Sequence, residues 1–347
     1  MPQVSVIVVN YNCHTTLKAC IHSILLSKNV GELVLVDNAS TDRSLELIQD
    51  YTTDERLKII PLKSNIGLAG ARNLAVTKTN CEYLAFTDAD SIVDPDWLGT
   101  PCSLLENYQT IGAVQCKMLS IKTPNLLSIA GTLVNGISWF KSPEKKLNFE
   151  LILFPVGACI ITRRDIWDIV SGFDSAFFVG HDDIDFGIRL WLRGYAVVCT
   201  SEGIVYHDGG NLRSSKGVAP IFHFYGGRNM LSIWAKDLEG RTLVKHVLPF
   251  SFFYPFQAFL HGGGITGIIG VISFLRTLPS ILTKRQKIQA HRKISDNVLV
   301  PMLRDANFLP VQEFTDDFRT VLKFILRKTR SIKKLKTLSL KNVLICK

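Results

Sequence analysis

Two aspartates separated by one residue, Asp88 and Asp90, follow an apolar run at residues 83–86. Carboxylates at this spacing can converge on a hard cation such as Mg²⁺ or Mn²⁺, which prefers oxygen ligands. A cation held there would bridge a diphosphate and stabilise the charge that builds on a departing phosphate. Taken alone, the same pair is more typical of an aspartate-rich turn.

A second acidic group, Asp182, Asp183 and Asp185, stands at the start of a segment with helical apolar spacing. Acidic residues at a helix start can serve as caps that the helix dipole favours. Three acids within four residues exceed what a cap needs, and one of them could act as a general base on a hydroxyl. His207 follows a short strand-like run and is a candidate third metal ligand.

The elements that must position these side chains alternate in type along the chain. Short apolar runs at 4–9, 33–36, 57–60 and 83–86 are separated by segments with helical spacing. This alternation predicts an α/β fold with a mainly parallel central sheet flanked by helices. Polar clusters follow three of these runs, where ligands bind beyond the carboxyl ends of parallel strands. The sequence therefore predicts a ligand site at this edge of the sheet.

The apolar excess of the chain is concentrated at residues 247–275, a stretch that prolines and a triple glycine divide in two. Basic residues follow it, and the chain from 318 to 347 carries ten basic residues and no acidic one. This pattern predicts short membrane-associated helices, peripheral or monotopic, on the cytoplasmic face of the cell membrane. The alternative is that these helices simply cover the rest of the protein.

The eight cysteines form no CxxC pair, which indicates a reducing compartment and neither a zinc ribbon nor a disulfide framework.

Several motifs together resemble those of family 2 glycosyltransferases, in particular rhamnosyltransferase-like inverting enzymes. The matching segments, in the family's order over roughly residues 4–230, are VSVIVVNYN, LVLVDNASTD, NIGLAGARNLA, LAFTDADSIVDPDWL, and VGACIITRRDIWDIVSGFDSAFFVGHDDIDFGIRLWLRGY followed by VYHDGG. The resemblance implies a GT-A catalytic domain at 1–240, with a nucleotide-binding half at 1–115 and an acceptor-binding half at 116–240. Membrane-associated helices at 241–295 and a basic tail at 296–347 would complete the chain.

The resemblance also implies roles for single residues. Tyr11 and Asp37 would contact the nucleotide base, Arg72 would hold the diphosphate, and Asp90 would be the more direct metal ligand. Asp183 stands where the family carries its catalytic base, but Asp182 replaces the usual glutamate beside it, so either acid could be the base. The implied sets are Asp183 and Asp182 for catalysis; Asn10, Tyr11, Asp37, Asn65, Gly67, Arg72, Asp88 and Ala89 for the nucleotide sugar; and Asp88, Asp90 and His207 for the metal.

The function implied is an inverting, metal-dependent transfer from a nucleotide-sugar donor to a hydroxyl of a lipid-linked or cell-surface glycan. Processive synthases typically carry a QxxRW motif, which this sequence lacks, so a single addition is expected.

One alternative is a catalytically silent nucleotide-sugar or glycan-binding module of the same fold. A nucleotidyltransferase would carry a glycine- and lysine-rich loop where residues 10–12 read Asn-Tyr-Asn. No nucleic-acid recognition motif is present, so no nucleic-acid partner is expected.

Overall fold

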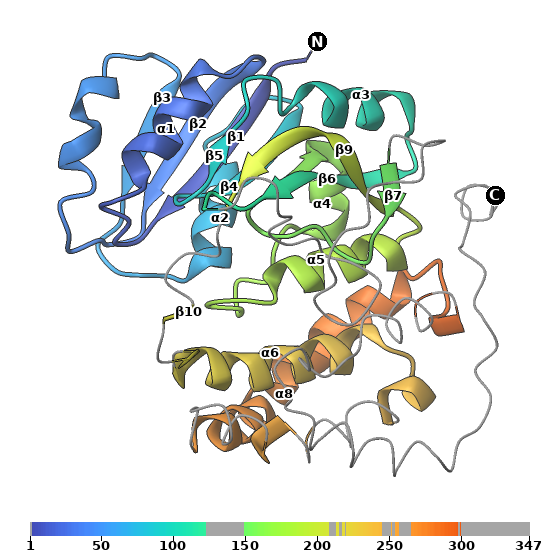
Figure 1. The fold of residues 1–347 in the computed structure, drawn as a ribbon. Helices are drawn as coiled ribbons and strands as arrows, with labels where there is room; N and C mark the ends of the chain where they lie inside the picture. The colour runs from blue at the N-terminus through green and yellow to red at the C-terminus, as the bar shows by residue number, and fades with distance from the viewer. Residues whose placement is uncertain are drawn as a thin grey trace.

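A nine-stranded mixed sheet forms the centre of the protein (Figure 1). The computed structural model describes residues 2–122, 149–207, 220–244 and 265–297, with short pieces at 213–214, 217–218, 251, 254–256 and 299. The strand order is β3-β2-β1-β4-β8-β6-β9-β5, and β7 pairs with β9. The strands are β1 (Val4–Asn10), β2 (Val30–Asp37), β3 (Leu57–Pro61), β4 (Tyr83–Asp88), β5 (Ile92–Val93), β6 (Ile111–Leu119), β7 (Phe149–Leu151), β8 (Ile160–Arg163) and β9 (Ala196–Tyr206).

The first four strands of this order are parallel, as the sequence predicts. Strand β1 is apolar apart from Ser5 and its last residue, Asn10, and it is buried along its whole length, as expected for a strand covered on both faces. Beyond β4 the sheet becomes mixed, because β8 runs antiparallel to both β4 and β6, and β5 runs antiparallel to β9. Strands β6 and β9 pair in parallel, so the prediction of an α/β fold with a mainly parallel sheet is confirmed, and the antiparallel strands are β5, β7 and β8.

The register of the parallel strands brings the predicted polar clusters together. Asn10 pairs with Asp37 across β1 and β2, and Val9 pairs with Asp88 across β1 and β4. The polar residues that end these strands therefore lie side by side at one edge of the sheet.

Helices cover both faces of the sheet. On one face, α1 and α3 pack over one apolar cluster, and on the other α2, α4 and α5 pack over a second. The helical elements are α1 (Leu17–Leu26), η1 (Glu46–Tyr51), α2 (Leu68–Val76), α3 (Gly99–Asn107), α4 (Arg164–Val170), α5 (Asp182–Leu192), α6 (Pro220–Asp237) and α8 (Thr266–Ala290); β10 (Arg213–Ser214) and β11 (Gly217–Val218) form a separate short hairpin.

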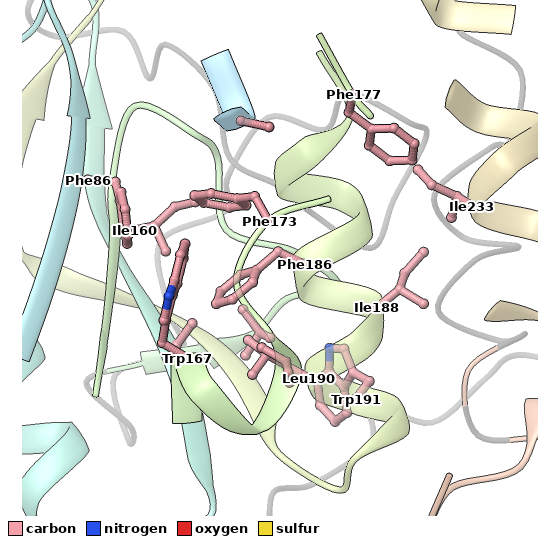
Figure 2. Packing of buried hydrophobic residues seen from close by; sticks show 14 of the residues in the cluster. Phe86, Ile160, Trp167, Phe173, Phe177, Phe186, Ile188, Leu190, Trp191 and Ile233 are labelled. Atoms are coloured by element: carbon pink, nitrogen blue, oxygen red, sulfur yellow. The ribbon is translucent and has the colours of Figure 1, made fainter. Parts of the chain in front are cut away.

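The second cluster is rich in aromatic rings that fix α5 against the sheet (Figure 2). Phe86 of β4 stacks on Trp167 of α4 with ring centroids 4.9 Å apart, and Phe173 meets both rings edge-on. Phe186 of α5 packs against Trp167 and Phe173. The start of α5 is thus held at a fixed place relative to the end of β4.

The same cluster continues into the carboxyl-terminal helices. It includes Ile233 of α6 together with Phe274 and Ile281 of α8. Figure 1 shows α6 and α8 crossing each other on the side of the sheet that α5 covers. These helices therefore share an apolar core with the sheet.

The predicted membrane segment is only partly described. After the triple glycine, α8 forms a single helix of 25 residues that contains Pro279. Within the described part of the chain, it is the one helix long and apolar enough to cross a membrane. Most of 245–264, the segment 123–148 and the tail from 300 onward lie outside the described residues.

Candidate active site

Asp88, Asp90 and His207 come together as the sequence predicts. Asp88 ends β4, Asp90 lies in the turn that follows, and His207 comes directly after β9. The antiparallel pairing of β5 with β9 places Tyr206 opposite Ile92 and so brings His207 to this turn. Nε2 of His207 lies 3.3 Å from Oδ1 of Asp90 and 3.7 Å from Oδ2 of Asp88.

This cluster has the chemistry of a divalent cation site. One ligand atom from each residue lies within 4.8 Å of the other two. Burial opposes ionisation of Asp90, but the hydrogen bond and charge of His207 outweigh it and hold the pKa of that carboxyl below its usual value. Two carboxylates and one imidazole suit Mn²⁺ or Mg²⁺, and the residues therefore fit the implied metal.

Arg72 links the metal cluster to the acids of α5. Its guanidinium is almost fully buried, and Nη2 donates to Oδ1 of Asp88 and to the carbonyl of Gly157, both at 2.7 Å. Nη1 donates to Oδ2 of Asp182 at 3.1 Å. The side chain also lies over the ring of Phe173, 5.5 Å from its centroid. Arg72 therefore positions two carboxylates in addition to supplying positive charge at the site.

The two acids at the start of α5 differ in environment. Asp182 is buried and paired with Arg72, whereas Asp183 is half-buried. Oδ2 of Asp183 accepts a hydrogen bond from the backbone N–H of Gly157 at 3.0 Å. Burial and the charge of Asp182 raise the pKa of Asp183 to about 7. A carboxylate with a pKa near neutrality is suited to take up a proton during a reaction.

Asn10 and Asp37 lie at the ends of β1 and β2. The side chain of Asn10 is fully buried, and Nδ2 donates to Oδ1 of Asp37 at 2.7 Å and to the hydroxyls of Ser40 and Ser44. The hydroxyl of Ser40 donates to the same Asp37 oxygen at 2.6 Å. Asn10 thus orients Asp37, while the neighbouring Tyr11 is exposed and free to stack on a ring.

The loop before α2 meets the loop before α5. Oδ1 of Asn65 accepts from the backbone N–H of Gly67, which has φ +80°. A Cβ on Gly67 would lie 2.6 Å from the carbonyl oxygen of Phe178, which accepts from the N–H of Leu68. Gly67 is therefore needed for this close approach of the two loops.

Ala89, which the sequence also predicts at the nucleotide-sugar site, is buried between the two metal-site aspartates.

Comparison with known proteins identifies the family of the domain that carries this site. Residues 5–170 match the sequence model of Glycosyl transferase family 2. The chain contains a family 2 glycosyltransferase domain.

Relatives of this family 2 domain act in surface-polysaccharide synthesis, and its fold recurs in solved structures. The O-antigen biosynthesis protein RfbC of Myxococcus xanthus is 28% identical over 230 residues, which are 61% of this chain and 18% of RfbC. TarS 1-349 of S. aureus, solved with UDP-GlcNAc, is 19% identical with a TM-score of 0.56, over 94% of this chain and 92% of TarS 1-349. The mannosyltransferase PcManGT from Pyrobaculum calidifontis, solved with GDP-Man and Mn²⁺, is 17% identical with a TM-score of 0.51, over 88% and 87%.

These matches establish the domain and its GT-A type of fold. The aligned segments make up 18%, 42%, 36% and 61% of the lengths of four curated relatives, so the chain spans less than two thirds of each. The rhamnosyltransferase-like subtype stays a prediction.

One residue of the family 2 site has no counterpart in the sequence prediction. Gly157 accepts from Arg72 with its carbonyl and donates to Asp183 with its N–H. A Cβ at this position would lie 3.1 Å from Nη1 of Arg72, so a side chain would press on the guanidinium. The only sequence signal is a glycine shortly before a buried strand, which is too common to mark a site.

Proposed function

We propose that the chain is an inverting, metal-dependent glycosyltransferase that adds a sugar from a nucleoside diphosphate donor to a glycan or lipid-linked hydroxyl. The observation that carries the proposal is the position of Arg72. Its guanidinium joins Asp88 of the cation site to Asp182, the neighbour of a carboxyl with a pKa of about 7. A cation site and a base are thereby held in one buried arrangement, which a binding module does not need.

Each residue has a role in the proposed reaction. Tyr11 and Asp37 bind the nucleotide base, by stacking and by accepting a hydrogen bond. Asp88, Asp90 and His207 would hold Mg²⁺ or Mn²⁺, which supplies Lewis acidity toward the diphosphate when bound. The positive charge of Arg72 helps to stabilise the same developing charge.

Asp183 is the proposed base. It removes the proton from the acceptor hydroxyl as that oxygen bonds to the anomeric carbon and the bond from this carbon to the phosphate oxygen breaks. The nucleoside diphosphate leaves with the electron pair, and a single displacement inverts the anomeric centre. Asp182 is the weaker candidate, because it is buried and already paired with Arg72.

The partners follow from the family and from the apolar carboxyl-terminal part. We infer a single addition to a surface glycan or its lipid-linked precursor at the cytoplasmic face of the membrane. The relationship to RfbC, an O-antigen biosynthesis protein, supports a polysaccharide acceptor.

The test is nucleotide release from a panel of UDP-, GDP- and dTDP-sugars with Mn²⁺ or Mg²⁺ and a membrane-lipid extract as acceptor. The wild type is compared with Asp90→Ala, Asp183→Asn and the control Asp168→Asn, which changes an exposed carboxylate on α4. We expect metal-dependent release from one donor, lost in the first two variants and kept in the control. Donor binding without release, unchanged by Asp183→Asn, would instead indicate a silent binding module.

A further inference from the structure

Helix α8 has two opposite faces. Gly267, Gly270, Phe274 and Ile281 are buried on the face that packs against α6. The opposite face carries six exposed apolar side chains, between 42% and 64% exposed, at the spacing of one helical stripe. We call this the outward stripe; its members are Ile265, Ile268, Ile269, Ile272, Leu275 and Leu282.

The packed face ties α8 to the rest of the protein by polar contacts as well as apolar ones. Nζ of Lys284 lies 2.5 Å from Oδ1 of Asp174, and Asp174 also pairs with the buried Lys236 of α6. Nη1 of Arg285 donates to the carbonyls of Ala235 and Leu238 at 2.7 and 2.6 Å. A helix that crossed a bilayer would have to give up these contacts and would place Arg276, in its middle, in hydrocarbon, which is costly. The contacts therefore favour a helix that stays on the protein.

The sequence segment that contains the outward stripe carries charge of a single sign. No acidic residue occurs between Glu239 and Asp296, while eight basic residues do: Arg241, Lys245, Arg276, Lys284, Arg285, Lys287, Arg292 and Lys293. Arg276 is exposed beside Leu275 of the stripe, and Lys287 is exposed one turn beyond its end. An apolar stripe flanked by cations matches the boundary of an anionic lipid leaflet in both hydrophobicity and charge.

We propose that the outward stripe lies in the headgroup boundary of an anionic membrane, so that α8 rests on one leaflet and does not cross it. The inference rests on the proposed function only in that a lipid-linked acceptor would explain the need for this surface. Helix α6 packs against both α8 and α5. Gly226 of α6 lies close to His181, the residue before Asp182, because a Cβ on this glycine would be 3.8 Å from the imidazole ring.

Flotation with vesicles tests whether the stripe binds lipid. The full chain is mixed with phosphatidylcholine vesicles with and without phosphatidylglycerol, without donor or acceptor. We expect flotation with the anionic vesicles that weakens in high salt, because the attraction is partly ionic. Ile268→Glu/Ile272→Glu should bind about tenfold more weakly or worse. The control Leu26→Glu, which changes an exposed leucine on α1, away from the stripe, should bind as the wild type does.

A depth measurement distinguishes resting on the leaflet from spanning it. A fluorophore is attached to Ile265→Cys or to Leu282→Cys, and its quenching by lipids brominated at different depths is measured. The signal of the wild type labelled at its native cysteines is subtracted. Seventeen residues of helix extend about 25 Å, so a spanning helix would place the two labels at depths differing by about that distance. A helix resting on the leaflet gives nearly equal, shallow depths.

Four results would overturn the proposal: no flotation with either vesicle, flotation unchanged in the double variant, unequal depths, or a wild-type dimer that the double variant dissociates. The last would make the stripe an interface between copies of the chain. Because flotation needs no donor, failure of the membrane inference and failure of the proposed transfer are seen separately.

Discussion

At the scale of single residues, the site depends on charges that would repel one another without Arg72. The guanidinium lies between Asp88 and Asp182, which come from β4 and α5. A planar guanidinium presents its donors in a fixed fork, which suits two carboxylates and a carbonyl better than a compact ammonium group does.

Replacing Arg72 with alanine should lower the free energy of unfolding by about 3 kcal/mol or more, because two carboxylates lose their buried partner. Arg72→Lys should recover part of this loss. The control is Arg43→Ala, which removes an exposed pair with Glu46 and should cost less than about 1 kcal/mol. Urea unfolding measures all three, and equal losses for Arg72→Ala and Arg43→Ala would contradict the account.

The raised pKa of Asp183 predicts how activity and stability respond to pH. As a base it must be ionised, so kcat/KM should rise with pH through about 7. The folded protein holds this proton at pH values where the unfolded chain, with an ordinary carboxyl, has lost it. The contribution of Asp183 to stability therefore falls as pH rises from its ordinary pKa of 3.8 toward 7.

Asp183→Asn removes this titration. The melting temperature of the variant should rise relative to that of the wild type as pH increases from about 4 to about 7, while the variant loses activity. Thermal unfolding at a series of pH values checks this. A difference that stays constant with pH would mean that Asp183 ionises normally in the folded protein.

The sequence predicts part of the site at this scale. Asp88, Asp90 and His207 could be anticipated because they follow strands whose ends must meet. The contacts of Gly157 with Arg72 and Asp183 could not, since they join residues far apart in the chain and depend on how α5 packs on the sheet. The burial that raises the pKa of Asp183 has the same origin.

At the scale of elements, Gly67 and Gly70 belong to one sequence motif but differ in what surrounds them. Gly67 has positive φ and faces the backbone of Phe178, whereas Gly70 lies within α2 and a Cβ there would be 3.6 Å from Ile66. The sequence NIGLAGAR does not reveal this difference, because the partner of Gly67 is over a hundred residues away.

Gly67→Ala should destabilise the protein by at least about 1–2 kcal/mol and weaken nucleotide-sugar binding, because positive φ and contact with Phe178 both oppose a side chain. Gly70→Ala should leave stability unchanged or raise it by up to about 1 kcal/mol, since alanine favours a helix. Thermal unfolding and donor titration of the two variants make the comparison. Equal effects would mean that the approach of the two loops is unimportant.

At the scale of the whole molecule, a buried charge network fastens the carboxyl-terminal helices to the sheet domain. Lys236 of α6 lies 2.5 Å from Asp185 of α5 and 2.7 Å from Asp174. Burial and the charge of Asp185 raise the pKa of the neighbouring Asp237 well above its usual value. The sequence showed only that this region is apolar and basic. Packing against protein and contact with lipid both require apolar residues, so only the tertiary contacts separate the two faces of α8.

Lys236→Met should cost about 3 kcal/mol of unfolding free energy, because two buried carboxylates lose a buried cation and keep only Lys284 for Asp174 and Arg189 for Asp185. Lys284→Met removes a half-exposed partner of Asp174 and should cost less than about 1 kcal/mol. Hydrogen exchange at 220–237 should quicken in the first variant far more than in the second. Similar exchange in both would show that the apolar core alone holds the helices.

The most direct test of the whole account is a comparison of sugar transfer and donor binding in Asp183→Asn, once the donor panel has identified the sugar nucleotide. Single-turnover transfer is measured with the metal present, and donor affinity is measured separately by titration. We predict that transfer slows by a factor of about 10²–10⁴, the usual contribution of a general base, while the donor Kd changes little. Transfer at close to the wild-type rate would contradict the assignment of Asp183 as the base and the mechanism built on it.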